Sequence, residues 1–138
     1  MRYSRTHEWV ETEEKDIVAV GFSNRAQEEF GEVVFVEFPE EGEEFEQDDP
    51  MGNIQCRSGA VIYIHAPITG EVVEVNTALE SSPELINISP EGDGWIVKMR
   101  LEVPGELNVL MTPDEYEDYE EEVLEEEFGF DDEDEEEY

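Results

Sequence analysis

The sequence predicts a single, mainly β domain with a short helix near its start and a second helix near its end. Three observations favour this fold class. Residues 17–22 and 33–38 are short runs rich in β-branched and aromatic side chains, as strands are. The string Gly-Glu-Val-Val occurs twice, 39 residues apart, and a helix-capping sequence begins at Thr112. At 138 residues the chain has room for one modest core.

A short helix is predicted between the two strand runs. Ser23 is a suitable N-cap residue, and Ala26 and Phe30 are spaced to share one helical face. Gly31 can end the helix in a left-handed conformation. The turn after the second strand run is predicted at residues 39–42, where Pro and Gly supply the usual turn residues.

The repeated string suggests two similar strand units. Residues 31–34 and 70–73 are each followed by alternating apolar residues and a polar turn, and then by an apolar stretch at 51–54 or 85–88. We expect two small antiparallel sheets related by a pseudo-two-fold axis, joined by a hairpin over about residues 55–63.

The last fifth of the chain is predicted to hold a helix and a disordered tail. Thr112, Pro113 and Glu115 form a capping sequence, and an apolar stripe follows at Tyr116, Tyr119, Val123 and Leu124. The stripe allows this helix to pack on the core. Seven of the ten residues at 129–138 are acidic and the segment has little to bury, so the domain is expected to span 1–128 and the tail 129–138.

The charge of the chain limits the classes of partner. Asp and Glu number 41 against 7 Lys and Arg, a formal net charge of −34. Nucleic acids and anionic membranes repel such a chain, so a basic protein surface is the expected partner. The alternative is that the acidity serves solubility in a salty cytoplasm, where ions screen the self-repulsion. Because like charges oppose association of copies, a monomer is expected.

Cys56 is the only cysteine, which is consistent with a reducing compartment. The N-terminus has no apolar run of signal-peptide length, and no stretch approaches the ~20 apolar residues of a membrane span. We therefore expect a cytoplasmic protein. No Cys/His cluster, calcium loop or phosphate-binding loop is present, so neither a metal site nor a catalytic residue is predicted. The segment at His7, Glu8 and Trp9 is interpreted as a strand start with Trp9 packed on the core.

Several short segments, in a fixed order, carry a family resemblance. They are Thr6-His7-Glu8-Trp9-Val10, Ala26-Gln27, Val34-Phe35-Val36-Glu37-Phe38-Pro39, Ala66-Pro67-Ile68-Thr69-Gly70-Glu71-Val72, Val75-Asn76, Leu79-Glu80, Pro83-Glu84-Leu85-Ile86-Asn87, Gly94-Trp95-Ile96-Val97-Lys98 and Glu115-Tyr116. With these segments the chain resembles the glycine cleavage system H-protein family, a relative of lipoyl and biotinyl carrier domains. The resemblance covers about residues 2–124.

The resemblance implies a barrel-sandwich hybrid: two flattened antiparallel sheets, a hairpin at one end and a C-terminal helix. It also implies a protein that is not an enzyme. In the family, a lysine on the hairpin tip carries lipoate through an amide bond. The arm takes an aminomethyl group from a pyridoxal-phosphate decarboxylase and passes it to a folate-dependent transferase. A flavoprotein dehydrogenase then reoxidises the arm.

The hairpin tip departs from the family pattern. The family has roughly Glu-Ser-Val-Lys-Ala there, whereas this chain has Gln-Cys-Arg-Ser-Gly-Ala at 55–60. Counting from either side puts the lysine position at Ser58 or Gly59, and neither is a lysine. Arg57 stays protonated and does not form the amide, and Ser58 has no evident general base. The only lysines, Lys15 and Lys98, lie far away in the sequence, so no cofactor is expected.

Cys56 is the remaining chemical candidate near the tip. Beside Arg57 its thiol could have a lowered pKa and serve as a redox or thioester site. Alternatively, Cys56 is a small apolar residue packed at the end of a strand.

Three functional hypotheses follow from these observations. The first is an H-protein-like interaction module for glycine-cleavage or lipoate-transfer enzymes with basic surfaces, not lipoylated at the family position. The second is a carrier of another covalent group, or of a thioester, through Cys56. The third is a scaffold protein unrelated to one-carbon metabolism.

Overall fold

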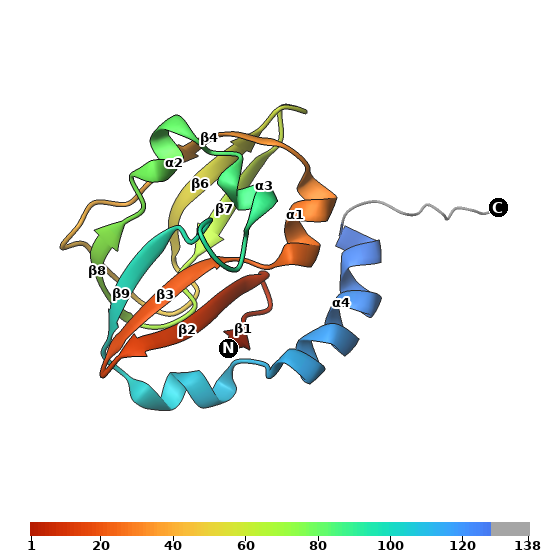
Figure 1. Cartoon of the computed structure of the whole chain (residues 1–138). Coiled ribbons are helices and arrows are strands. Elements are labelled where there is room, and N and C mark those ends of the chain that lie inside the picture. Colours follow the sequence, from red (N-terminus) through yellow and green to blue (C-terminus); the bar gives the residue numbers. More distant parts are fainter. Residues whose placement is uncertain (128–138) are drawn as a thin grey trace.

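The computed structural model describes residues 1–127 and contains two antiparallel sheets with few helices (Figure 1). The larger sheet has the order β1-β2-β3-β9-β8-β5 and the smaller the order β4-β6-β7. The strands of the larger sheet are β1 (Arg2–Tyr3), β2 (Glu8–Glu14), β3 (Ile17–Phe22), β5 (Glu44–Phe45), β8 (Gly70–Val75) and β9 (Val97–Leu101). Those of the smaller sheet are β4 (Val33–Glu37), β6 (Pro50–Cys56) and β7 (Val61–His65). The mainly β fold class predicted from the sequence is confirmed.

Buried side chains from both sheets form one core. The cluster includes Val18, Val20 and Phe22 from β3, Ile54 from β6, Ile64 from β7, and Val72, Val97 and Met99 from β8 and β9. On β8 and β9 these side chains alternate with less buried ones. β3 is instead buried on both faces, because Ala19 packs in a second cluster with Tyr3, Trp9 and Tyr116. None of the described helices is both long and apolar enough to cross a membrane.

The two copies of the repeated string lie in different sheets, at the start of β4 and of β8. The hairpin expected over 55–63 is also present, but both of its strands, β6 and β7, belong to the smaller sheet, so it does not join the two sheets as expected. The second apolar stretch, 85–88, was expected to continue a strand unit, and that expectation is wrong because it forms helix α3 (Leu85–Ile88). The Asn87 side chain explains its placement: its amide donates to Gly31 O at 2.7 Å and accepts from Val33 N at 2.9 Å. This amide ties α3 to the entrance of β4. Helix α2 (Ala78–Ser81) precedes it.

The first helix forms as its capping residues predict. Helix α1 (Asn24–Phe30) begins after Ser23, whose hydroxyl accepts the Ala26 N–H at 3.1 Å. It ends at Gly31, which has φ +81°. Ala26 and Phe30 are its buried residues, and the Phe30 ring lies edge-on to Phe22 with 5.3 Å between centroids. The predicted apolar face is thus the one that meets the core.

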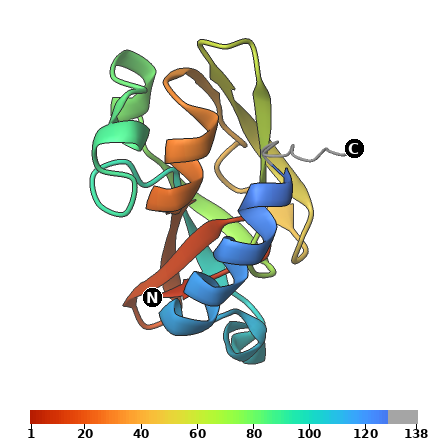
Figure 2. The ribbon, with the colours of Figure 1, turned by 90° about the vertical axis from the view of Figure 1, so that its right-hand side faces the viewer.

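The C-terminal helix α4 (Pro113–Glu127) follows a 3-10 helix, η1 (Pro104–Val109). The predicted capping box is formed: Glu115 N donates to Thr112 Oγ1 at 3.2 Å, and Thr112 N donates to Glu115 Oε1 at 2.9 Å. Tyr116 is buried and stacks on Tyr3 at 4.4 Å. Figure 2 looks onto α4, with α1 and the N-terminal strands beside it. The Val123 and Leu124 side chains and the tail expected at 129–138 lie outside what the structure describes.

Candidate functional site

The tip of the β6–β7 hairpin is a tight turn made by residues 57–60. Gly59 N donates to Cys56 O at 2.8 Å, and Cys56 N donates to Ala60 O at 2.9 Å. Gly59 has φ +98°, a conformation that glycine adopts without a steric penalty. The turn therefore owes its shape to Gly59, and it projects from the body of the molecule (Figure 1).

Arg57 is fixed to the segment that precedes β4. Its Nε donates to Glu32 Oε1 at 2.7 Å and its Nη2 to Glu32 Oε2 at 3.0 Å. The Arg57 backbone N–H also donates to Glu32 O at 2.9 Å. The pKa of the Glu32 carboxyl is lowered, mainly by its side-chain hydrogen bonds with Arg57 and to a smaller extent by the positive charge of Arg57. Arg57 thus braces the base of the tip rather than presenting a reactive group.

The two candidates for the family lysine position differ in backbone conformation. Gly59 is left-handed, so a side chain there is strained although nothing lies within 4 Å of its would-be Cβ. Ser58 is exposed and is not among the residues with positive φ. Its Oγ accepts the Ala60 N–H at 3.4 Å. Neither residue supplies an amine to which a lipoyl group could be joined through an amide.

Cys56 lies at the end of β6, opposite Val33 on β4. It belongs to the core cluster and is only 4% exposed. Burial raises the pKa of its thiol, whereas a nucleophilic cysteine needs a lowered pKa and access to solvent. These observations favour the packing interpretation of Cys56 over the redox or thioester site.

The two lysines lie away from the tip, Lys98 on β9 of the larger sheet and Lys15 in the turn between β2 and β3. Lys98 Nζ is 2.8 Å from Glu13 Oε1 and 4.9 Å from the centroid of the Trp95 ring. The hydrogen bond to Glu13 is the main cause of the raised pKa of Lys98. Lys15 is exposed in the turn between β2 and β3, at the opposite end of the molecule from the β6–β7 tip (Figure 1).

Sequence reasoning missed a buried carboxyl group at Glu8. Ser4 Oγ and Thr6 Oγ1 both donate to Glu8 Oε1 at 2.5 Å, and His65 N donates to Oε2 at 2.8 Å. Burial raises the pKa of Glu8 to about 7, and these hydrogen bonds offset only part of the effect. His65 Nδ1 lies 3.9 Å from Oε2 and has no hydrogen-bond partner. The charge on Glu8 therefore changes near neutral pH.

A signal for this buried group was present in the sequence, in the two hydroxyl residues that precede Glu8. His7, between Thr6 and Glu8, has φ +77°, which is unusual for a residue with a side chain. His7 N donates to Ser4 O at 3.2 Å, closing a turn that brings the Ser4 and Thr6 hydroxyls onto one carboxylate oxygen. The strand start and the packing of Trp9 are as expected, with Trp9 3% exposed.

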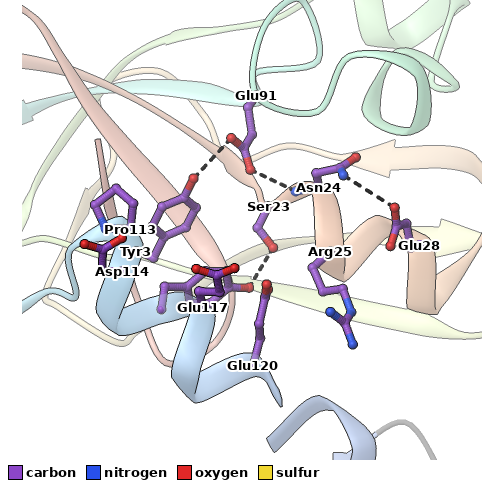
Figure 3. A pocket seen from close by; sticks show the side chains of 11 residues that line it. Tyr3, Ser23, Asn24, Arg25, Glu28, Glu91, Pro113, Asp114, Glu117 and Glu120 are labelled. Carbon is purple, nitrogen blue, oxygen red and sulfur yellow. Dashed lines mark hydrogen bonds between the residues drawn. The ribbon is translucent and has the colours of Figure 1, made fainter. Parts of the chain in front are cut away.

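An acidic pocket of about 380 Å³ lies between β1, α1 and α4 (Figure 3). Its carboxyl groups are those of Glu28, Glu91, Asp114, Glu117 and Glu120, and Arg25 is its one base. Glu91 accepts from Tyr3 Oη at 3.1 Å and from Asn24 N at 3.0 Å. Burial, more than the neighbouring carboxylates, raises the pKa of Glu120. Within residues 1–127, no group of acidic, His or Cys side chains is placed to hold a metal ion.

Comparisons with known proteins agree with the fold. The family model "Glycine cleavage H-protein" matches residues 1–123. The glycine cleavage system H protein of Thermotoga maritima is 42% identical over 118 residues, 86% of this chain and 94% of the relative. The mitochondrial H protein of Oryza sativa subsp. indica is 43% identical over 116 residues, 84% of this chain and 70% of the relative. The crystal structure of an H protein from Mycobacterium marinum superposes with a TM-score of 0.75 at 30% identity, covering 87% and 93% of the two chains.

These matches correct one expectation. The sequence predicted that no cofactor is bound. Proteins of the matching family carry lipoate, so lipoate is the usual cofactor of this family. The expectation was wrong because it was inferred from the tip alone, and the tip is only a small part of the matched residues. The match over residues 1–123, together with identities above 40% along most of the chain, shows that this protein belongs to the glycine cleavage H-protein family.

Proposed function

We propose that this protein is a non-catalytic, H-protein-like interaction module that docks on glycine-cleavage or lipoate-transfer enzymes and is not lipoylated at the family position. Family membership supports the docking role. The composition of the hairpin tip carries the second part of the proposal, because residues 57–60 contain an arginine, a serine, a glycine and an alanine but no amine.

The chemistry of attachment supports this proposal. An amide forms when a neutral amine attacks an activated acyl group. The Arg57 guanidinium stays protonated and is held by Glu32, so it does not act as that nucleophile. The Ser58 hydroxyl has no carboxylate or imidazole hydrogen-bonded to it among the described contacts. A lipoyl group on this chain therefore has only Lys15, Lys98 and the α-amino group as positions for an amide.

A modification assay tests the attachment part. The protein is incubated with a lipoate ligase, lipoic acid and ATP, and its intact mass and tryptic peptides are measured. We expect no lipoyl group on the peptide that contains residues 58–60. The matched control is Ser58→Lys, which places an amine on the same exposed turn without a positive-φ side chain and should gain one lipoyl group. A lipoyl group that peptide fragmentation places on residues 57–60 of the wild type, and not on Lys98 of the same tryptic peptide, would refute the proposal.

A competition assay tests the docking part. The glycine cleavage reaction is reconstituted with a lysine-bearing, lipoylated H protein, and the present protein is added in increasing excess. A module that docks on the same enzymes should slow the reaction until its binding sites are filled. Reaction rates that stay constant up to a hundredfold excess would exclude docking on these enzymes and favour the scaffold hypothesis.

A further inference from the structure

The outward face of the smaller sheet carries large apolar side chains. The strand register places Phe35 beside Gln55 and Gln55 beside Val61, and it places Asn53 beside Tyr63. Residues paired in this way point to the same side of the sheet. We call this surface, made of Phe35, Glu37, Asn53, Gln55, Val61 and Tyr63, the β4–β7 face. Its Phe35, Val61 and Tyr63 side chains are 52%, 48% and 56% exposed.

These side chains are exposed although the sheet itself is packed against the core. On the other side of the same strands, Val36 and Ile54 are buried in the core and Ile62 packs against it. A solvent-facing sheet surface normally carries polar side chains, and apolar ones gathered on one face mark an interaction site. Aromatic residues such as Phe35 and Tyr63 are also enriched in protein interfaces.

A groove of about 510 Å³ adjoins this face. Glu37, Asn53 and Tyr63 belong to both the groove and the β4–β7 face. The remaining groove residues are Phe38, Pro39, Glu40, Glu43, Pro50, Met51 and Gly52. The groove thus combines apolar walls with three carboxylates and has no basic residue in its lining.

The three carboxylates of the groove are not neutralised by a positively charged side chain in the described ion pairs. Glu37 accepts from Asn53 Nδ2 at 3.1 Å, and Glu43 accepts from Glu40 N at 3.1 Å. None of the ion pairs found among the described residues involves Glu37, Glu40 or Glu43. Arg57, the one Lys or Arg between residues 32 and 65, is already paired with Glu32. The field over the face is therefore negative.

We propose that the β4–β7 face is the docking surface for a basic protein surface, and that an arginine side chain of that partner enters the groove. This inference rests on the docking function proposed above and specifies where docking occurs. A guanidinium can stack on Tyr63 while it pairs with the carboxylates of Glu37 and Glu40, and its stem can pack on the apolar walls. A second copy of this chain is a poor occupant, since its net charge of −34 repels the same face.

Two variants and two matched controls test the location. Tyr63→Ser removes the aromatic anchor, and Glu40→Lys reverses one charge of the groove. Val109→Ser and Glu11→Lys make the same kinds of change at exposed positions outside the β4–β7 face and its groove. Binding of each full-length protein to the purified decarboxylase, aminomethyltransferase and dehydrogenase of the same organism is measured at two salt concentrations. All four positions are exposed, and circular dichroism checks that the variants fold.

For the enzyme that binds, we expect Tyr63→Ser and Glu40→Lys each to raise Kd at least tenfold, and each control to change it less than twofold. Glu40→Lys should also reduce the salt dependence of binding, because it removes an attractive charge. If the wild type binds an enzyme and both face variants bind it with the same Kd, this inference is wrong and the docking function still stands. If the wild type binds none of the three enzymes, the docking function itself fails. Self-association that Tyr63→Ser abolishes would identify a second copy as the occupant and overturn the inference.

Discussion

The Ser23 hydroxyl lies 2.7 Å from the Tyr116 hydroxyl and also caps α1 by accepting the Ala26 N–H at 3.1 Å. The Ser23 Oγ atom thus caps the N-terminus of α1 and also links α1 to α4 by a hydrogen bond. The Tyr116 hydroxyl further contacts His7 Nδ1 at 3.1 Å, next to the strand that carries Glu8. Three segments that are far apart in the sequence meet at this hydrogen-bond network, part of which appears in Figure 3.

Tyr116→Phe should therefore destabilise the domain by about 1–2 kcal/mol, because two buried hydrogen-bond partners lose the phenol while the stacked ring remains on Tyr3. Urea unfolding followed by fluorescence measures the change. Tyr119→Phe is the control, since its hydroxyl donates to Arg5 O at a more exposed position and should cost less. Equal losses in the two variants would contradict the proposed role of the network.

Glu8 should make stability fall as the pH rises toward neutrality. Its pKa is raised from 4.5 to about 7 in the folded state, so the folded chain keeps the Glu8 proton over a range in which the unfolded chain has lost it. The stabilisation from this group is complete below pH 4.5 and is lost as the pH passes through about 7. The difference of about 2.5 units corresponds to about 3 kcal/mol.

Glu8→Gln isolates this effect from the many other carboxyl groups. Glutamine stays neutral, so the free energy of unfolding of the wild type minus that of Glu8→Gln should decrease by about 3 kcal/mol between pH 4.5 and 8. Urea titrations at several pH values give this difference. Glu11→Gln, at an exposed position of the same strand, serves as the control. A difference that is constant with pH would show that Glu8 is ionised throughout.

Gly70→Ala should disrupt the pairing of β8 with β9. A Cβ atom at Gly70 collides with the carbonyl oxygen of Arg100, which belongs to the partner strand and has no freedom to move aside. We expect a loss of at least about 2 kcal/mol in the free energy of unfolding. Gly105→Ala, where nothing lies within 4 Å of the added atom, should change stability by less than about 1 kcal/mol. Thermal unfolding of both variants provides the comparison.

Cys56 should react slowly with thiol reagents in the folded protein. Its burial and the raised pKa of its thiol both limit attack on small electrophiles at pH 8. Labelling with iodoacetamide, followed by mass spectrometry, should be at least tenfold faster in urea than in buffer. Labelling at equal rates in the two conditions would restore Cys56 as a candidate attachment site.

Strands and caps were the predictable part of the fold, because they depend on residues close together in the sequence. The strand at 17–22, the cap at Ser23 and the capping box at Thr112 all follow from local patterns. Residues 85–88 were misread because four apolar and polar residues fit a strand and a helical turn equally well. The Asn87 contacts that settle the choice reach residues more than fifty positions away.

The site was predictable only in outline. The absence of lysine from residues 57–60 can be read from the sequence, but the bracing of Arg57 by Glu32 depends on bringing together two positions 25 residues apart. The burial of Glu8 was predictable only in part, since the hydroxyls of Ser4 and Thr6 are local to it but its contact with the backbone of His65 is not. The composition of the β4–β7 face required the strand register, because a shift of one residue would turn Tyr63 inward.

The exposed rings of Phe35 and Tyr63 also have a practical consequence for handling this protein. β7 is the last strand of the smaller sheet, and its outer edge can accept another strand. Electrostatic repulsion keeps molecules apart while the carboxyl groups are ionised, but the isoelectric point is about 4.1. Acidification toward that value should cause reversible precipitation through this edge, so chromatography and crystallisation trials belong well above it.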